Sequence, residues 1–186
     1  MPLYFVLLPV LTIFREASFT YRSIEAYFLN YSRLLSNLKI NNINTHSCFL
    51  AAASNSEGTC KFDVKTAFNY HSAGGKISQK GNLTVSKIKI DNFKLDKKID
   101  GIKIDTEGQE FEVLEGAKSS INKDKPDIIF EINENCFDKC LKLLKLNKYN
   151  FYFIDEIEDK ITRIQEFSSN LKRPEGSNCY ATVNQI

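Results

Sequence analysis

Two carboxylates follow directly after an apolar run near the middle of the chain. Ile102-Lys103-Ile104 is typical of a buried strand, Asp105 and Glu107 come next, and an amphipathic helix begins after Gly108. In open α/β sheets, ligands and reactive groups gather at the carboxyl ends of the strands. Two acids this close together are costly to hold unless a positive charge shares them. The spacing therefore predicts a functional site rather than a scaffold, where carboxylates at a strand end can accept protons or hydrogen bonds.

A third acid, Glu131, ends the next apolar run, residues 127–132. The predicted catalytic residues are therefore Asp105, Glu107 and Glu131. Lys103 either balances the charge of Asp105 or faces a helix. Glu110 stands in the first turn of the following helix, where the helix dipole favours an acid, so it is either structural or part of the site.

Metal chemistry is less well defined by the sequence. Oxygen ligands suit magnesium or calcium, so a divalent metal bridging the three acids stays open, but no residue is assigned as a metal ligand. Two histidines and five irregularly spaced cysteines cannot assemble a familiar zinc site. The cysteines, Cys136 and Cys140 among them, are expected to be free thiols in a reducing compartment.

Strands and helices alternate along the chain, which predicts an α/β fold with a doubly wound, mostly parallel sheet. Asn30 is a candidate cap for the first helix. Helical spacing of apolar residues marks two more helices, one after Gly108 and one near residues 137–144. The predicted strands cover residues 23–28, 48–53, 59–64, 83–90, 102–104, 127–132, 150–154, 161–164 and 179–183.

The composition describes one domain, residues 1–186. The chain is 42% hydrophobic and carries a formal net charge of +2, which does not suggest a nucleic-acid partner. The apolar run at residues 3–14 is too short to be a stable membrane span. It is expected to be a strand and the start of a helix interrupted at Pro9, with a signal segment as the alternative. The expected location is cytoplasmic, in keeping with free thiols in a reducing compartment. Residues 66–82 lack periodicity and predict a mobile loop, either a substrate lid or a disordered segment.

The stretch Asp100–Ala117 resembles the signature of the FkbM-type methyltransferases, and three further segments resemble that family in the expected order: Ala51–Ser54, Ile88–Phe93 and Lys125–Glu131. This resemblance implies a Rossmann-like class I methyltransferase fold and the cofactor S-adenosyl-L-methionine. It also implies methyl transfer to oxygen on a sugar or another small-molecule acceptor.

The cofactor half departs from the family pattern. The resemblance implies cofactor-binding positions at Phe28, Leu29, Ala51, Ala52 and Asp105. The family's first strand leads into a glycine-rich turn, yet residues 1–20 contain no glycine. Phe28 stands where the family has an acid that binds the ribose hydroxyls, and leaving those groups unpaired costs about 1–3 kcal/mol each. The N-terminal part, residues 1–22, is therefore predicted to be incomplete or degenerate.

Three hypotheses follow. The first is an S-adenosylmethionine-dependent methyltransferase that modifies a hydroxyl of a small molecule or glycan. The second is a catalytically inactive methyltransferase-like remnant that acts as a binding protein. The third is a fragment from a mispredicted gene start.

Overall fold

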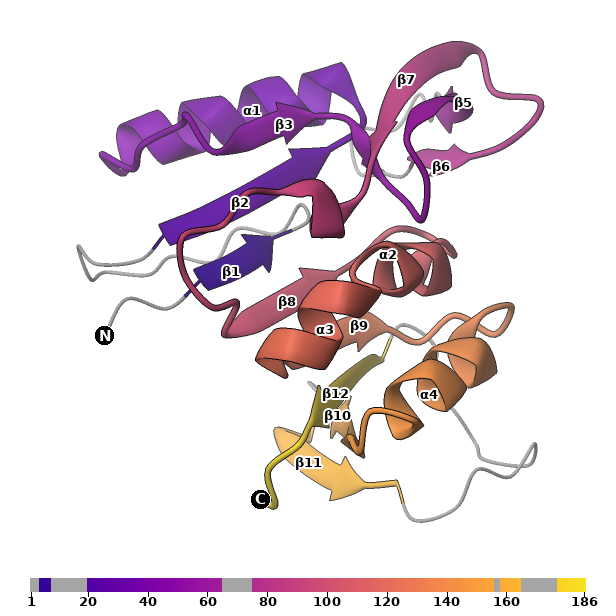
Figure 1. Ribbon diagram of the computed structural model, residues 1–186. Helices are drawn as coiled ribbons and strands as arrows, with labels where there is room; N and C mark the ends of the chain where they lie inside the picture. The colour runs from indigo at the N-terminus through magenta and orange to yellow at the C-terminus, as the bar shows by residue number, and fades with distance from the viewer. Residues whose placement is uncertain (1–3, 8–19, 65–74, 156–157, 165–176) are drawn as a thin grey trace.

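The structure is a computed structural model that describes residues 4–7, 20–64, 75–155, 158–164 and 177–186. Among the described residues, strands and helices alternate between residues 83 and 155, whereas five strands follow one another between residues 48 and 88 and three between residues 150 and 182 (Figure 1). The strands are β1 (Tyr4–Leu7), β2 (Thr20–Glu25), β3 (Cys48–Leu50), β4 (Ala52–Ala53), β5 (Gly58–Val64), β6 (Gly75–Ile77), β7 (Leu83–Ile88), β8 (Gly101–Ile104), β9 (Asp127–Glu131), β10 (Asn150–Asp155), β11 (Lys160–Arg163) and β12 (Asn178–Thr182). The helices are α1 (Phe28–Ile40), the short 3₁₀ turn η1 (Ile90–Asn92), α2 (Glu110–Gly116), α3 (Lys118–Asp124) and α4 (Phe137–Lys145).

The main sheet is mixed. Its described strands have the order β11-β10-β12-β9-β8-β1-β2-β3. The strands from β3 to β9 in this order run parallel, whereas β12 is antiparallel to both β9 and β10, and β10 is antiparallel to β11. The predicted α/β class is confirmed, but a doubly wound, mostly parallel sheet is not. The last strands have no helical crossovers among the described residues, and parallel neighbours need such crossovers.

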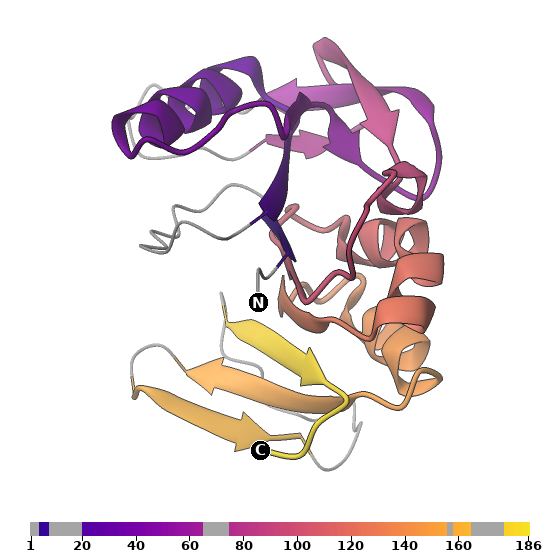
Figure 2. The same cartoon turned by 60° about the vertical axis from the view of Figure 1, so that its left-hand side comes forward.

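Helices lie on both sides of this sheet, with α1 on one side and α2, α3 and α4 on the other (Figure 2). The side that carries three helices holds the hydrophobic core. Ile104, Leu114, Phe130 and Leu144 are among its fully buried members. By contrast, α1 contains no buried residue. The sheet is therefore anchored mainly through α2–α4.

A second, smaller sheet has the order β4-β7-β5-β6 among the described strands. The predicted strand at residues 48–53 is in fact divided between the two sheets, because the chain leaves the main sheet after Leu50 and pairs with β7 from Ala52. The predicted mobile loop at residues 66–82 is wrong for Gly75–Ile77, which form β6 against β5. The part of that loop at residues 66–74 lies outside the described residues.

The N-terminal apolar run does contain a strand, as predicted. β1 lies between β2 and β8 in the interior of the main sheet. Pro9 and the predicted helix start lie outside the described residues. None of the described helices is long and apolar enough to cross a bilayer.

Candidate active site

Three acids meet the same edge of the main sheet. Because β2, β8 and β9 are parallel, their carboxyl ends lie on one rim. Glu25 is the last residue of β2, Asp105 follows β8, and Glu131 is the last residue of β9. The register pairs Ile104 with Phe130, so the next residues along these strands, Asp105 and Glu131, are neighbours.

Glu131 experiences the charges of the other acids. Burial, followed by repulsion from Asp105, Glu107 and Glu110, raises the pKa of its carboxyl from its ordinary 4.5 to about 7, and Lys103 opposes this shift. The Oε2 atom of Glu131 is buried and has no hydrogen-bond partner among the described residues. A buried carboxylate oxygen without a partner is costly and is often explained by a catalytic role or an absent ligand.

Lys103 resolves one alternative left open by the sequence. Its Nζ atom lies 3.7 Å from Oδ2 of Asp105, and both side chains are partly exposed. Lys103 therefore balances the charge of Asp105 and also favours the charged form of Glu131.

Glu110 organises the turn that carries these acids. Its side chain is fully buried. Oε1 accepts hydrogen bonds from the backbone N–H of Thr106 at 3.0 Å, from the Thr106 hydroxyl at 2.9 Å and from the backbone N–H of Gly108 at 3.1 Å. Glu110 therefore holds the turn after β8 in shape, a role that a macrodipole argument alone does not reveal.

The same turn contains two consecutive residues in the left-handed region. Glu107 has φ = 54° and is exposed, and Gly108 has φ = 101°. A Cβ atom added at Gly108 would lie 3.3 Å from Nδ2 of Asn133, in the segment after β9. The glycine thus allows the turns after β8 and β9 to approach closely. Glu107 is more exposed than Asp105 and Glu131, which are half-buried.

A thiol at the start of α4 contacts the acid that holds the turn after β8. The Cys136 thiol donates a hydrogen bond to Oε2 of Glu110 at 3.0 Å. A hydrogen bond with Cys136, together with burial and nearby acids, raises the pKa of the Cys140 thiol. All five cysteines are free.

Across the described residues, no group of three or more His, Cys, Asp or Glu side chains is arranged to hold a metal ion.

Asp91, from the segment that resembles the family before its signature, has a structural role. Its two carboxylate oxygens accept the backbone N–H groups of Ser119 and Ser120 at 2.9 and 2.8 Å. These N–H groups belong to the first turn of α3 and have no partner within the helix. Asp91 therefore fixes α3 beside η1.

The predicted strand at residues 23–28 is wrong at its end. β2 stops at Glu25, and Phe28 already begins α1, whose N-cap is Tyr27 rather than Asn30. The acid at the end of this strand is therefore Glu25, which the sequence reasoning missed by placing the strand end three residues late. The signal was present, because Glu25 directly follows the apolar Ile24.

Glu25 is a buried acid at the rim. Its side chain is 5% exposed. Burial raises the pKa of this carboxyl, and hydrogen bonds from the backbone of Tyr27 and Ala26 oppose the shift. The Tyr27 N–H donates to its Oε1 at 2.7 Å. Its position and its capacity to accept further hydrogen bonds fit an acid that binds hydroxyl groups.

The other predicted cofactor positions differ in their surroundings. Phe28 and Leu29 are 60% and 50% exposed at the start of α1, close after Glu25. Ala51 and Ala52 are buried where the chain passes from β3 to β4. Their contact with a cofactor stays a prediction, as do the catalytic roles of Asp105, Glu107 and Glu131.

The chain belongs to the methyltransferase FkbM domain family, whose model matches residues 9–164. Among solved structures it is similar to the crystal structure of methyltransferase FkbM from Methylobacillus flagellatus KT, with a TM-score of 0.55 and 16% sequence identity. The similarity covers 87% of this chain but 36% of that protein, so this chain spans about a third of its length. At this identity the likeness supports the fold alone. A comparison with curated proteins gave no significant match.

Proposed function

We propose that this protein is an S-adenosylmethionine-dependent methyltransferase that transfers a methyl group to a hydroxyl of a small molecule or glycan. The observation that carries the proposal is the pairing of Asp105 and Glu131 at the rim, with an unpartnered oxygen on Glu131. Five free thiols suit a reducing compartment such as the cytoplasm.

The acids divide the work according to their surroundings. Asp105 forms an ion pair with Lys103 and orients the acceptor hydroxyl by accepting its hydrogen bond. Glu131, with a pKa of about 7, accepts the proton of the hydroxyl as the oxygen is methylated. S-adenosylmethionine, when bound, supplies an electrophilic methyl group on a sulfonium.

Glu25 is the residue proposed to hold the ribose hydroxyls of the cofactor. It ends the strand next to β1 on the same rim as Asp105, and its buried carboxylate has acceptor capacity beyond the Tyr27 N–H. The order β3-β2-β1-β8-β9, with β12 antiparallel beyond it, fits the Rossmann-like class I methyltransferase fold that the family resemblance implies. The acceptor capacity of Glu25 and this strand order therefore support a cofactor site at the carboxyl ends of these strands.

Isothermal titration calorimetry with S-adenosylmethionine and S-adenosylhomocysteine tests the cofactor half. Measurable heat and a thermal shift are expected. The absence of both heat and a thermal shift at millimolar ligand would support the alternative, a remnant that binds something else.

Turnover tests the catalytic half, measured as S-adenosylhomocysteine formed with a panel of sugars and small alcohols. Asp105→Asn is expected to lower the rate about 10²-fold by loosening the position of the acceptor, without weakening cofactor binding. Asp96→Asn, an exposed acid outside the rim, is the matched control and should leave the rate unchanged. The wild-type rate should rise with pH around 7 and Glu131→Gln should flatten this profile. Unchanged turnover in Asp105→Asn would show that Asp105 does not orient the acceptor hydroxyl.

A further inference from the structure

A groove separate from the acidic rim lies along α2, α3 and α4 on the outer side of the molecule. It has a volume of about 490 Å³. Its apolar lining comes from Phe111, Leu143 and Leu146, and its charged lining from Lys118, Lys139 and Lys142. None of these residues takes part in the proposed methyl transfer.

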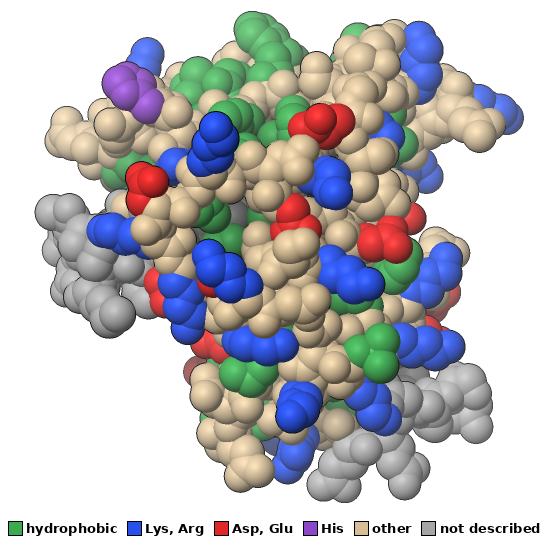
Figure 3. Space-filling model, in the orientation of Figure 1, with side chains coloured by type: hydrophobic (Ala, Val, Ile, Leu, Met, Phe, Trp, Pro, Cys, Tyr) green, Lys and Arg blue, Asp and Glu red, His purple; other side chains and the backbone are tan. Residues whose placement is uncertain are grey.

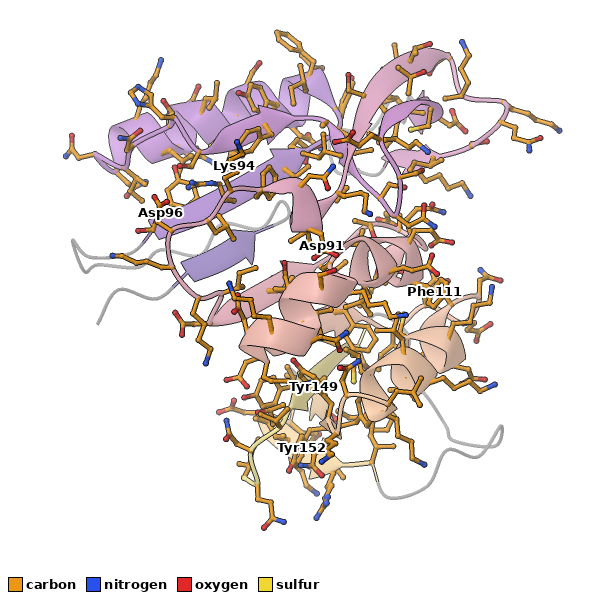
Figure 4. All side chains as sticks on the ribbon, in the orientation of Figure 1. Asp91, Lys94, Asp96, Phe111, Tyr149 and Tyr152 are labelled. Atoms are coloured by element: carbon orange, nitrogen blue, oxygen red, sulfur yellow. The ribbon has the colours of Figure 1, made fainter. Side chains whose placement is uncertain are left out.

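One apolar residue of the lining is open to solvent. Leu146, at the end of α4, is 87% exposed. Phe111 comes from α2 near α4 (Figure 4), and Nζ of Lys139 lies 5.8 Å from the centre of its ring. Phe111 and Leu143 are partly buried and pack against the core, so Leu146 is the apolar residue of this lining that projects into solvent.

The groove lies within a larger positive surface. Lysine side chains gather over α3 and α4 in the space-filling view, with apolar side chains among them (Figure 3). Lys123 on α3, Lys145 at the end of α4 and Lys148 shortly after it are further exposed lysines of these elements. Asp138 and Glu134 are the exposed acids of α4 and the segment before it, so positive charge predominates.

The choice of lysine rather than arginine on this surface distinguishes between candidate partners. Protein interfaces are depleted in lysine, and sites for carboxylate-bearing peptides favour the forked guanidinium of arginine. Six exposed lysines on and next to α3 and α4, with no arginine among them, are instead point charges on long stems, which suit a diffuse anionic surface. Their long alkyl stems also tolerate the edge of an apolar layer.

We propose that the surface formed by Lys118, Lys123, Lys139, Lys142, Lys145, Lys148 and Leu146 docks the protein on an anionic lipid membrane. The ammonium groups contact lipid phosphates and carboxylates, and Leu146 enters the boundary between headgroups and acyl chains. This places α3 and α4 against the membrane and leaves the acidic rim, at the carboxyl ends of β2, β8 and β9, for the acceptor. The inference does not depend on the proposed activity.

Co-sedimentation with vesicles tests this docking. One set contains phosphatidylcholine alone, and the other contains phosphatidylcholine with phosphatidylserine. Binding is expected to the second set only and to be abolished by high salt, because exposed charges are screened. Lys139→Ala combined with Lys142→Ala should weaken binding about 25-fold, since each lysine near the surface contributes about fivefold. Leu146→Ser should weaken binding about tenfold by removing apolar burial.

The matched control combines Lys76→Ala with Lys80→Ala, two exposed lysines in and near the second sheet. This variant makes the same change in net charge and should bind within about twofold of wild type. Far-ultraviolet circular dichroism confirms that each variant is folded. Equal loss of binding in the control, binding to neutral vesicles, or no binding to anionic vesicles at low salt would overturn the proposal. So would a labelled glutamate-rich peptide that binds the groove while anionic vesicles do not.

Discussion

The turn after β8 and the turn after β2 lie on the same rim of the main sheet but differ in the number of contacts that hold each in shape. The first is held by Glu110, which is fully buried and accepts three hydrogen bonds within it. In the second, Glu25 accepts the Tyr27 N–H, and the helix that follows has no buried residue and no side-chain cap.

This difference suggests which half of the site is preorganised. A catalytic carboxylate must be held within a fraction of an ångström, and buried supporting hydrogen bonds provide that precision. The turn after β8 has this support. The turn after β2 presents exposed Phe28 and Leu29, so its shape depends more on what binds against it.

The largest expected effect comes from the firm turn. Glu110→Ala leaves three partly buried donors of Thr106 and Gly108 without a partner, so the free energy of unfolding should fall by about 3 kcal/mol. Urea denaturation measures this change. Glu134→Ala, an exposed acid in the segment after β9, should change stability by less than about 0.5 kcal/mol. Equal effects would show that the buried network does not hold the turn.

The second effect concerns the less supported turn. Glu25→Gln keeps an acceptor for the Tyr27 N–H but removes the charge that favours hydroxyl donors. Affinity for S-adenosylhomocysteine should fall about 5- to 30-fold, or about 1–2 kcal/mol, by calorimetry. Phe28→Ala is the control, because the sequence comparison placed Phe28 where the family has its ribose-binding acid. A larger loss in Phe28→Ala than in Glu25→Gln would reverse the assignment.

A smaller effect appears in the pH dependence of stability. The pKa of Glu131 is raised from 4.5 to about 7 in the folded state, so folding binds a proton between these values. The associated stability is present below about pH 4.5 and is lost as the pH rises through about 7. With screening of this partly exposed residue, the loss is about 1 kcal/mol. Unfolding curves at pH 5 and pH 8 should show this decrease relative to Glu131→Gln, and parallel behaviour of the two proteins would contradict it.

The smallest effect separates backbone strain from close approach. Gly108 and Gly58 both have positive φ, but a Cβ atom at Gly58 meets nothing within 4 Å, whereas one at Gly108 meets Asn133. Both substitutions by alanine should cost about 1 kcal/mol through strain. Gly108→Ala should cost somewhat more by thermal denaturation. An equal cost would mean that the contact between the turns after β8 and β9 adjusts freely.

Several features could be predicted from the sequence because they are local. Runs of apolar residues located β8 and β9, and the position of Asp105 and Glu131 at the strand ends followed from where each run stops. The signature Asp100–Ala117 identified the family, which the match to residues 9–164 confirmed.

Other features depend on contacts between distant parts of the chain. The antiparallel pairing of β12 with β9 joins residues about fifty positions apart, and no local pattern specifies that pairing. The end of β2 was misplaced because Ala26-Tyr27-Phe28 continues an apolar run, and pairing with β1 and β3 decided where the strand stops.

The sequence by itself determined that acids follow the apolar strands, because strand ends are marked by local changes in polarity. Only the tertiary structure decided that Glu131 has a raised pKa, that Glu110 is a buried support, and that Glu25 shares their rim. The physical reason is that burial and charge repulsion depend on distances through space, which the parallel register of β8 and β9 sets.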